Sequence, residues 1–393
     1  MKRLRIGFAC DWKKPRIRTW SHTAHSLYTA LSKMENVECV DLDLSLPQYQ
    51  VYLYALRNAT IVNGTLKSKF RFSPAYARRL EKNFDRLLKT SGPFDAIIEI
   101  IDPAVTREIP CYFYQDVSVD MLIRYYREHG KPRPQFEMFS MDDLLRWRDR
   151  QHRMYEACAG VFCMSRALAE SLVTESGLPP SKVHLVHAGV HVQPQRVSEP
   201  PLDKEGQPMI LFVGRDFFRK AGDLVVEAFQ ILRRDSFPRS KLVVAGPQKW
   251  PLRGPIPPGV IFLGDASWPI LQQYYSFADL FCMPSRTEGF GIAFIEALCY
   301  GIPCIARKDP VLEETIQDGV NGFLLENDDP TELARLMQQA LNDSSLREKL
   351  HVRIPEYQQY YSWRRVAGDM IQVVQRDLAG PKQKVGPVSA TAK

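Results

Sequence analysis

Short apolar runs alternate with longer amphipathic stretches along most of the chain, and this alternation begins a second time after residue 208. Runs of this length are typical of strands buried in a parallel sheet, and the stretches between them suit the crossover helices that such a sheet needs. The order of elements therefore predicts right-handed βαβ units and an α/β fold with two parallel sheets. In the first half we expect strands at 4–10, 37–42, 96–101, 110–114, 160–164 and 183–187, and helices near 22–33, 74–89, 141–158 and 167–176. In the second half we expect strands at 209–213, 241–245, 260–263, 280–283, 303–306 and 322–325.

The domain limits follow from the length and from one change in composition. A chain of 393 residues exceeds what one hydrophobic core supports, so we expect two domains. Residues 194–208 are rich in proline and charge, which suits a linker between residues 1–193 and residues 209–360. Residues 361–378 predict a final amphipathic helix, and residues 379–393 a disordered tail. Each domain should be Rossmann-like and doubly wound, and the two should face each other across a cleft.

The charged residues are unevenly distributed along the chain. The net charge is +7, and residues 1–200 hold 29 Lys and Arg against 22 Asp and Glu, whereas residues 201–393 hold 23 of each kind. An anionic partner should therefore meet the first half. No apolar run reaches the length of a membrane span, and the first residues predict a strand rather than a signal peptide. The eight cysteines include no CxxC pair, so we expect reduced core residues in a cytoplasmic protein and no zinc site.

The most informative stretch is 284–301, which reads PSRTEGFGIAFIEALCYG. It follows an expected strand, and a helix should begin just after its glycines, where free N–H groups suit a phosphate. Gly289 and Gly291 allow the backbone to approach a ligand closely, and the carboxylates of Glu288 and Glu296 suit sugar hydroxyls. We interpret the stretch as a nucleotide-sugar site. In the alternative interpretation, Glu288 caps the helix and Glu296 is solvated.

A second loop places cations at the same edge of the second sheet. The strand at 209–213 ends at Gly214, and the loop after it carries Arg215, Arg219 and Lys220. The planar fork of Arg215 and the point charge of Lys220 could hold a diphosphate between them. Such a pair stabilises a departing nucleoside diphosphate without a metal ion. The alternative is that these cations are simply solvated, as most loop cations are.

The sequence argues against a nicotinamide, a flavin or a metal ion as a cofactor. No GxGxxG motif follows the first strand, which argues against a nicotinamide or flavin enzyme. Asp41 and Asp43 form a DxD pattern, which we interpret as the polar end of a strand rather than a metal site. We therefore expect no metal ion and no cofactor, with the nucleoside diphosphate sugar as a co-substrate.

These residues resemble the retaining glycosyltransferases of the large family four, the glycosyl transferases group 1, which have the GT-B fold. The E-x7-E signature of that family is matched by Glu288 and Glu296 with GFGIAFI between them. Its G-R-x4-K element is matched by Gly214, Arg215 and Lys220. The resemblance implies a second domain that holds the donor and a first domain that holds the acceptor.

Further segments extend the resemblance over nearly the whole chain. Glu314 with the following TIQDGVNGFL, Gly189 in KVHLVHAGV, and the YSW at 361–363 all resemble family segments. The resemblance is strong in residues 209–342 and weaker before residue 190. It implies that the last helix crosses back onto the first domain.

The resemblance also implies a role for each site residue. Glu288 would contact the donor sugar, Glu296 would bind the ribose, and Arg215 with Lys220 would hold the diphosphate. Residues around 260–264, including Leu263, would approach the base. The donor-binding residues are then Gly214, Leu263, Gly289, Phe290, Gly291 and Glu296, and the catalytic residues on this side are Arg215, Lys220 and Glu288.

The first domain departs from the family pattern at two places. Many relatives have a Gly-Gly loop after the first strand, whereas this chain has Trp20, Ser21 and His22, with His22 where a glycine would be. These three are the acceptor-side candidates. Many relatives carry a histidine after the fourth strand, where this chain has Asp116, which we take as a catalytic contact to the sugar or the acceptor hydroxyl. In the alternatives, Asp116 caps the next helix and His22 starts one.

The expected reaction is the metal-independent transfer of a sugar to a hydroxyl with retention at the anomeric carbon. The acceptor would be a saccharide, a lipid-linked molecule or another small molecule. No pair of carboxylates is spaced for a double displacement, so we assign no covalent nucleophile. A glycosyl phosphorylase, an epimerase on the same fold, or a non-catalytic nucleotide-sugar-binding module remain alternatives. Nucleic-acid binding is disfavoured because no recognised motif occurs.

One basic segment points to a membrane surface. Residues 66–89 combine many cations with apolar side chains such as Phe70 and Phe84, which predicts an amphipathic helix lying on an anionic membrane. The protein would then be peripheral at the inner membrane face, and a lipid-linked or phosphate-bearing acceptor would follow. The alternative is an ordinary surface helix with a solvated basic face.

Overall fold

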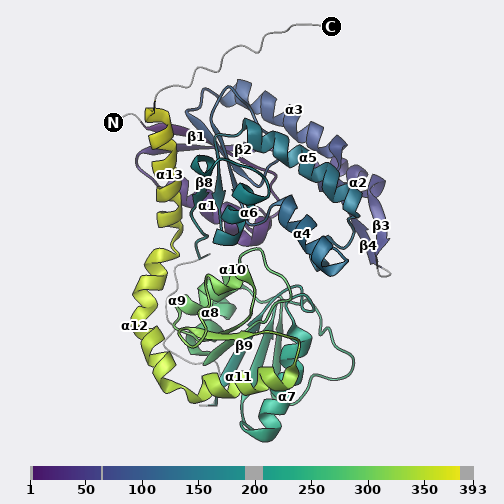
Figure 1. Ribbon diagram of the computed structural model, residues 1–393, viewed down its shortest axis with the longest axis vertical. Coiled ribbons are helices and arrows are strands. Elements are labelled where there is room, and N and C mark those ends of the chain that lie inside the picture. Colours follow the sequence, from purple (N-terminus) through teal and green to yellow (C-terminus); the bar gives the residue numbers. More distant parts are fainter. Residues whose placement is uncertain (1–2, 63–64, 191–206, 381–393) are drawn as a thin grey trace.

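The computed structural model describes residues 3–62, 65–190 and 207–380. Its strands form two parallel six-stranded sheets and one antiparallel hairpin. The expected linker lies outside the described residues up to position 206, and the expected tail does so from position 381. The two parallel sheets confirm the predicted pair of doubly wound Rossmann-like domains (Figure 1).

The first sheet has the strand order β2-β1-β5-β6-β7-β8. All its strands lie within two residues of the expected limits. Every residue of β5 and β6 is buried, because helices cover both faces of the sheet. The strands are β1 (Leu4–Cys10), β2 (Val37–Asp43), β5 (Ala96–Ile100), β6 (Cys111–Gln115), β7 (Gly160–Cys163) and β8 (Val183–Leu185).

The second sheet has the order β11-β10-β9-β12-β13-β14. Its central strand β9 is apolar throughout and pairs in parallel with β10 and β12. These strands also match the expected ones closely. They are β9 (Met209–Val213), β10 (Lys241–Ala245), β11 (Val260–Gly264), β12 (Leu280–Cys282), β13 (Cys304–Arg307) and β14 (Gly322–Leu325).

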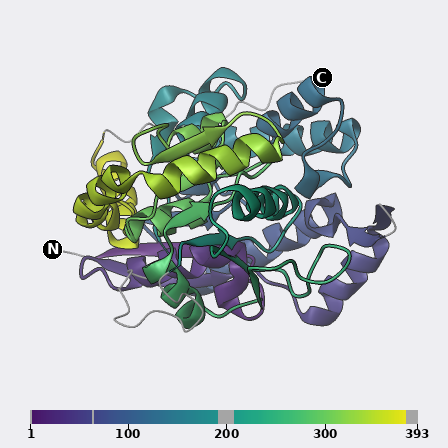
Figure 2. The same cartoon turned by 90° about the horizontal axis from the view of Figure 1, so that it is seen from below.

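Helices cover both sheets in the two views of Figures 1 and 2. No helix of the described chain is both long and apolar enough to cross a bilayer. The first-domain helices are α1 (Thr23–Ser32), α2 (Gln48–Arg57), α3 (Pro74–Ser91), α4 (Val119–His129), α5 (Met141–Ala157) and α6 (Arg166–Thr174). The second-domain helices are α7 (Gly222–Asp235), α8 (Trp268–Phe277), α9 (Ile292–Cys299), α10 (Pro310–Glu313) and α11 (Pro330–Asn342).

Two C-terminal helices tie the domains together. Helix α12 (Ser344–Tyr360) runs beside the second domain, and α13 (Trp363–Ala379) continues along the first (Figure 1). The Tyr112 hydroxyl donates to Asp377 of α13 at 2.9 Å. Gly189 lies so close to α13 that a Cβ there would come within 2.7 Å of Trp363. One hydrophobic cluster therefore extends from the second sheet through α13 into the first sheet.

The structure corrects the sequence prediction in one region. Residues 66–89 do not form one helix, because strand β4 (Thr65–Ser68) and a short 3-10 turn precede α3. Helix α3 begins at Pro74, where Ser73 accepts a hydrogen bond from the Tyr76 amide as an N-cap. Helices α2 and α4 and the hairpin of β3 (Ala59–Val62) with β4 were not expected.

Candidate active site

The sequence motifs meet at the switch point of the second sheet. Strand β9 lies between β10 and β12, so the chain leaves β9 toward one side and returns later on the other. Connections that diverge in this way open a ligand crevice beyond the carboxyl ends of the strands. Gly214 follows β9, and residues 284–291 follow β12. The two motifs therefore come from adjacent strands.

A buried ion pair joins these two motifs. The Lys220 ammonium contacts Glu288 Oε1, and Arg219 Nη1 lies 3.8 Å from Glu288 Oε2. Burial would raise the pKa of the Glu288 carboxyl, but Lys220 and Arg219 outweigh burial and hold that pKa below its ordinary value. Arg219 also donates to the Thr287 carbonyl at 2.8 Å. Lys220 is thus one member of a charged cluster, and Arg219 contributes a second cation to it.

Helix α9 begins at a glycine that adopts a left-handed conformation. Gly291 is the N-cap, with φ 90° and ψ 49°. Other residues adopt such a φ only with strain. The cap is thus not Glu288, which removes the alternative that this carboxylate only caps the helix. Phe290 is buried and packs toward His187, with 6.1 Å between ring centroids.

Glu296 is buried rather than solvated. Only 9% of it is exposed, and the Tyr275 hydroxyl donates to its Oε2 at 3.1 Å. Burial raises the pKa of Glu296 to about 7, although the hydrogen bond from Tyr275 opposes this shift. A buried carboxyl with one internal partner retains capacity to accept further hydrogen bonds.

Arg215 lies at the outer edge of the site. Its side chain is 58% exposed, and its Nη2 lies 3.3 Å from Asp265, just after β11. Arg18 of the first domain approaches the same carboxylate at 3.7 Å. Asp265 thus bridges cations from the two domains, close to the half-buried Leu263.

Asp116 faces the second domain across the domain boundary. A Cβ on Gly289 would come within 2.5 Å of Asp116 Oδ2, so only glycine permits this approach. Burial raises the pKa of Asp116 to about 6, although hydrogen bonding to Trp20 and the charge of Arg133 lower it. The N-cap of the following helix α4 is Ser118. This excludes the alternative in which Asp116 caps that helix.

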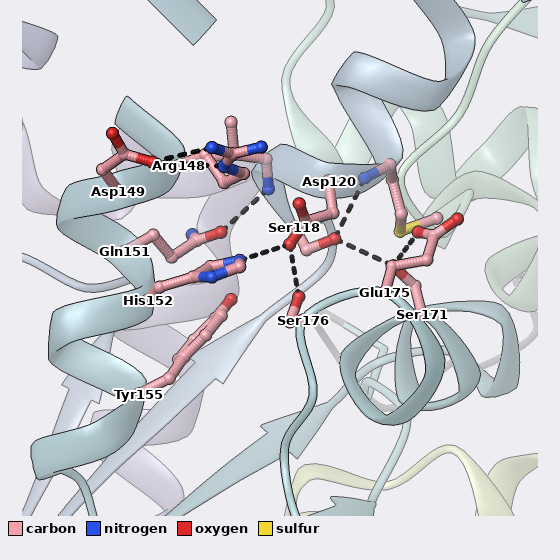
Figure 3. Close-up of polar contacts among 12 residues, drawn as sticks. Ser118, Asp120, Arg148, Asp149, Gln151, His152, Tyr155, Ser171, Glu175 and Ser176 are labelled. Atoms are coloured by element: carbon pink, nitrogen blue, oxygen red, sulfur yellow. Dashed lines mark hydrogen bonds and ion pairs between the residues drawn. The ribbon is translucent and has the colours of Figure 1, made fainter. Parts of the chain in front are cut away.

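The loop around Asp116 is held by a polar network that joins α4, α5 and α6 (Figure 3). Asp120 accepts from Ser176 at 2.6 Å and lies 2.7 Å from His152 Nε2. The Ser118 and Ser171 hydroxyls are 3.0 Å apart. In a nucleophilic triad the serine would donate to the histidine, whereas here Ser176 and His152 meet the same carboxylate. This network is therefore structural.

The acceptor-side candidates adopt an uncommon backbone. Trp20, Ser21 and His22 have φ values of 46°, 52° and 72°, in the left-handed region that favours glycine. His22 is the N-cap position of α1 but makes no capping bond with its side chain. Burial lowers the pKa of His22, and the nearby charge of Arg215 from the second domain lowers it further.

Arg133 is a buried cation that the sequence analysis missed. It is 7% exposed, its Nη1 donates to the Glu288 carbonyl at 3.4 Å, and its guanidinium lies 5.4 Å from the Tyr125 ring centroid. Its Nε has no partner among the described residues. Nearby, the Thr287 hydroxyl donates to Gln135 at 3.0 Å. The first domain thus contributes its own cation beside the E-x7-E motif.

The described residues contain no group of three or more His, Cys, Asp or Glu that could hold a metal ion. The DxD pattern instead forms ion pairs, because Arg16 lies 2.5 Å from Asp41 and 2.7 Å from Asp43. The expectation of a reaction without a metal ion remains a prediction.

Glu314 connects the domains at a second point. Its two oxygens accept from the Arg166 and Ala167 amides, each at 2.7 Å, at the N-terminus of α6. A carboxylate suits the positive end of a helix. This segment after the E-x7-E motif therefore docks onto the first domain.

Comparison with known proteins agrees with the motifs over part of the chain. Residues 195–356 match the family model of glycosyl transferases group 1. A D-inositol 3-phosphate glycosyltransferase of Jonesia denitrificans is 30% identical over 60% of this chain and 61% of its own length. One from Frankia alni is 32% identical over 44% of this chain and 47% of its own length. The chain thus spans only part of these relatives.

Solved structures support the fold over nearly the whole chain. Sucrose-phosphate synthase from Thermosynechococcus elongatus superposes with a TM-score of 0.66 at 17% identity, covering 95% of this chain and 99% of that one. Anabaena HepE in complex with UDP and glucose gives 0.63 at 14% identity, covering 95% and 100%. The fold is that of GT-B glycosyltransferases. Residues 195–356 of the chain are thus similar to the glycosyl transferases group 1 family, and the likeness to solved structures extends the fold over nearly the whole chain.

Proposed function

We propose that the protein transfers a sugar from a nucleoside diphosphate sugar to a hydroxyl acceptor, with retention at the anomeric carbon. The largely buried cluster of Lys220, Arg219 and Glu288 carries this proposal. It lies at the switch point of the second sheet beside the first turn of α9, where an anion gains from both charge and free amides. The solved structure of HepE with UDP and glucose adds support at the level of the fold.

The donor fits the chemistry of the second domain. Among the described residues, Tyr275 is the hydrogen-bond partner of the Glu296 carboxyl, so the carboxyl oxygens keep capacity to accept hydrogen bonds from the hydroxyls of a ribose. Arg215 is exposed and Lys220 is largely buried, so the two present cations at two depths for the diphosphate. The amides near Gly291 complete this cradle.

In the proposed reaction the bond between the anomeric carbon and the diphosphate oxygen breaks, and its electron pair leaves with the diphosphate. The acceptor oxygen bonds to the anomeric carbon on the face that the diphosphate leaves. The acceptor proton goes to the departing phosphate oxygen, whose negative charge grows as the bond breaks. Lys220, Arg215 and the N-terminus of α9 stabilise this charge, and no metal ion is required. Asp116 holds a hydroxyl of the sugar or the acceptor by a hydrogen bond.

The acceptor should carry an anionic group such as a phosphate. Two cations of the first domain contact the second, because Arg18 lies 3.7 Å from Asp265 and Arg133 donates to the Glu288 carbonyl at 3.4 Å. Partial burial lowers the pKa of Lys13, and the nearby Arg71 and Arg215 lower it further. Arg133 adds a buried guanidinium. The relatives named as D-inositol 3-phosphate glycosyltransferases have a phosphate-bearing molecule in their names, which supports this class of acceptor.

A thermal-shift screen of nucleoside diphosphates and their sugars tests the donor. A ligand that binds only the folded state raises the melting temperature by mass action. One nucleotide sugar should stabilise the protein, and Glu296→Ala should lose that shift. The shifting donor is then incubated with inositol 3-phosphate or with free inositol. Consumption with the phosphorylated acceptor alone supports the proposal, and sugar 1-phosphate formed with inorganic phosphate would indicate a phosphorylase.

A further inference from the structure

Helix α2 exposes an apolar stripe that no part of the described chain covers. Tyr49, Tyr52, Leu53 and Leu56 are spaced as on one helix face and are between 54% and 71% exposed. No residue of α2 is buried. A surface helix normally turns such a stripe toward the core. Here the stripe faces solvent.

The opposite side of α2 anchors it to the domain. Val51 and Tyr54 pack against the cluster beneath α3, and the Tyr54 ring meets Tyr76 with centroids 5.4 Å apart. The outward direction of Leu53 and Leu56 is therefore fixed by packing and is not a consequence of a loosely held helix.

The neighbouring hairpin extends this surface. Ile61 and Leu66 are paired across β3 and β4 and are 74% and 68% exposed. Ser68 of the hairpin donates to the Ala55 carbonyl of α2 at 2.8 Å. We call the combined surface of Tyr49, Tyr52, Leu53, Leu56, Ile61 and Leu66 the apolar rim. A cluster of this kind on a soluble domain marks an interaction site.

A basic face lies beside the apolar rim. Helix α3 exposes five cations, namely Arg78, Arg79, Lys82, Arg86 and Lys89. Arg79, Lys82 and Arg86 line a groove together with Leu46 and Pro47, which immediately precede α2. Helices α2 and α3 and the hairpin follow the same outer edge of the first domain in both views (Figures 1 and 2). Apolar and basic groups are thus presented side by side.

We propose that this edge docks onto an anionic lipid bilayer. The apolar rim would enter the interfacial layer, where tyrosines are favoured, and the groove of α3 would receive lipid phosphates. The positive net charge favours an anionic bilayer as the partner, because residues 1–200 carry the whole net charge of +7. The apolar stripe of α2 suits the acyl chains of a bilayer, and the five exposed cations of the neighbouring helix α3 suit its anionic headgroups.

The docked edge lies next to the proposed active site. Lys67 of the hairpin pairs with Glu137, and Lys69 lies 2.6 Å from Asp143 at the start of α5. Glu137 follows the turn that carries Arg133 and Gln135, which contact the E-x7-E motif. Resting on the proposed function, this placement makes the acceptor a lipid whose headgroup carries a hydroxyl and a phosphate.

Co-sedimentation of the full chain with vesicles tests the docking. The protein should pellet with vesicles of phosphatidylcholine and phosphatidylglycerol and remain in solution with phosphatidylcholine alone. The double variant Leu53→Ser with Leu56→Ser should lower the partition coefficient about tenfold or more. The triple variant Arg79→Ala, Lys82→Ala and Arg86→Ala should lower it by a similar factor and reduce its salt dependence.

Matched controls come from other surfaces. Val352 of α12 is 82% exposed, so Val352→Ser removes an exposed apolar side chain elsewhere. Arg239, Lys349 and Arg364 are exposed cations outside the edge and form the control triple to alanine. Both controls should sediment like the wild type. Equal pelleting of all variants would overturn the proposal, as would dimers in ultracentrifugation that Leu53→Ser with Leu56→Ser dissociates.

The outcome is separable from the proposed function. Vesicle binding needs no donor, and the apolar-rim variants should keep the melting temperature and the donor-induced shift of the wild type. Loss of the donor shift in the wild type would instead contradict the proposed function and leave the docking result standing.

Discussion

The ion pair between Lys220 and Glu288 joins two loops that are 68 residues apart in sequence and follow adjacent strands of one sheet. Both side chains are largely buried, with 14% and 6% exposed. Two buried charges at this depth stabilise the fold only as a pair, because each would otherwise be desolvated without compensation. The same contact fixes the cation beside the first turn of α9.

Replacing Lys220 should therefore affect stability and turnover together. Lys220→Ala leaves the buried Glu288 with Arg219 as its one ion-pair partner among the described residues, which should cost about 3–5 kcal/mol in the free energy of unfolding. Loss of the cation beside the diphosphate should lower kcat about 100-fold or more. Urea unfolding and steady-state kinetics measure both. Arg239→Ala, on a distant surface, serves as the control, and a Lys220→Ala protein with normal stability and kcat would rule out the assigned role.

Donor affinity should depend on pH through Glu296. In the folded protein the pKa of Glu296 is about 7, above its ordinary value of 4.5. Between pH 4.5 and 7 the folded protein therefore binds a proton that the unfolded chain does not. The free energy of unfolding should fall as pH rises through this range. An ionised carboxylate accepts hydroxyl hydrogen bonds better, so donor affinity should rise as pH passes 7. Glu296→Gln should bind donor more weakly and flatten both profiles. Calorimetric titration from pH 6 to 8 is decisive, and an unchanged profile in the variant would assign the titration to another group.

A methyl group at position 289 should separate the domains. Gly289→Ala places a Cβ within 2.5 Å of Asp116 Oδ2, closer than real contacts allow. We expect kcat to fall about tenfold or more, with little change in donor affinity. Asp116→Ala should lower the rate on its own, but the double variant should lose less than the product of the two losses. Strictly multiplicative losses would show that the two residues do not meet.

Arg133 should act on the acceptor and not on the donor. Arg133→Lys keeps the charge but loses the planar fork, so the KM for a phosphate-bearing acceptor should rise about tenfold while the donor-induced thermal shift is retained. Arg133→Ala should raise the KM for the phosphate-bearing acceptor further. If both variants change donor binding instead, Arg133 contributes to the donor site.

The alternation of apolar runs was sufficient to predict both parallel sheets, because fully buried strands leave a simple apolar signature. Helix α4 was missed although Ser118 and Gly130 mark its two ends. Helix α2 could not be predicted from an apolar stripe that packs on a core, since its stripe from Tyr49 to Leu56 faces solvent. The helix predicted at 74–89 is α3, whereas the amphipathic helix predicted over residues 66–89 begins too early, because the N-cap at Ser73 separates α3 from β4.

The candidate active site could be predicted only in part from the sequence. The motif residues Glu288, Glu296 and Lys220 could be placed at one sheet edge from their positions after predicted strands. That Lys220 pairs with Glu288 depends on the strand order, in which β9 and β12 are neighbours. Arg133 could not be predicted, because it lies in a loop without a motif and nothing in the sequence shows that this loop reaches the second domain.

Proton NMR of the reaction, with the donor that gives the thermal shift, tests the proposed transfer from a nucleotide sugar with retention most directly. The anomeric proton of the first product formed should show the same configuration as that of the donor, with one nucleoside diphosphate released for each bond formed. Lys220→Ala should slow both signals in parallel. An inverted anomeric centre would contradict retention, and no consumption of any nucleotide sugar with phosphate-bearing, lipid-linked or saccharide acceptors would contradict the transfer itself.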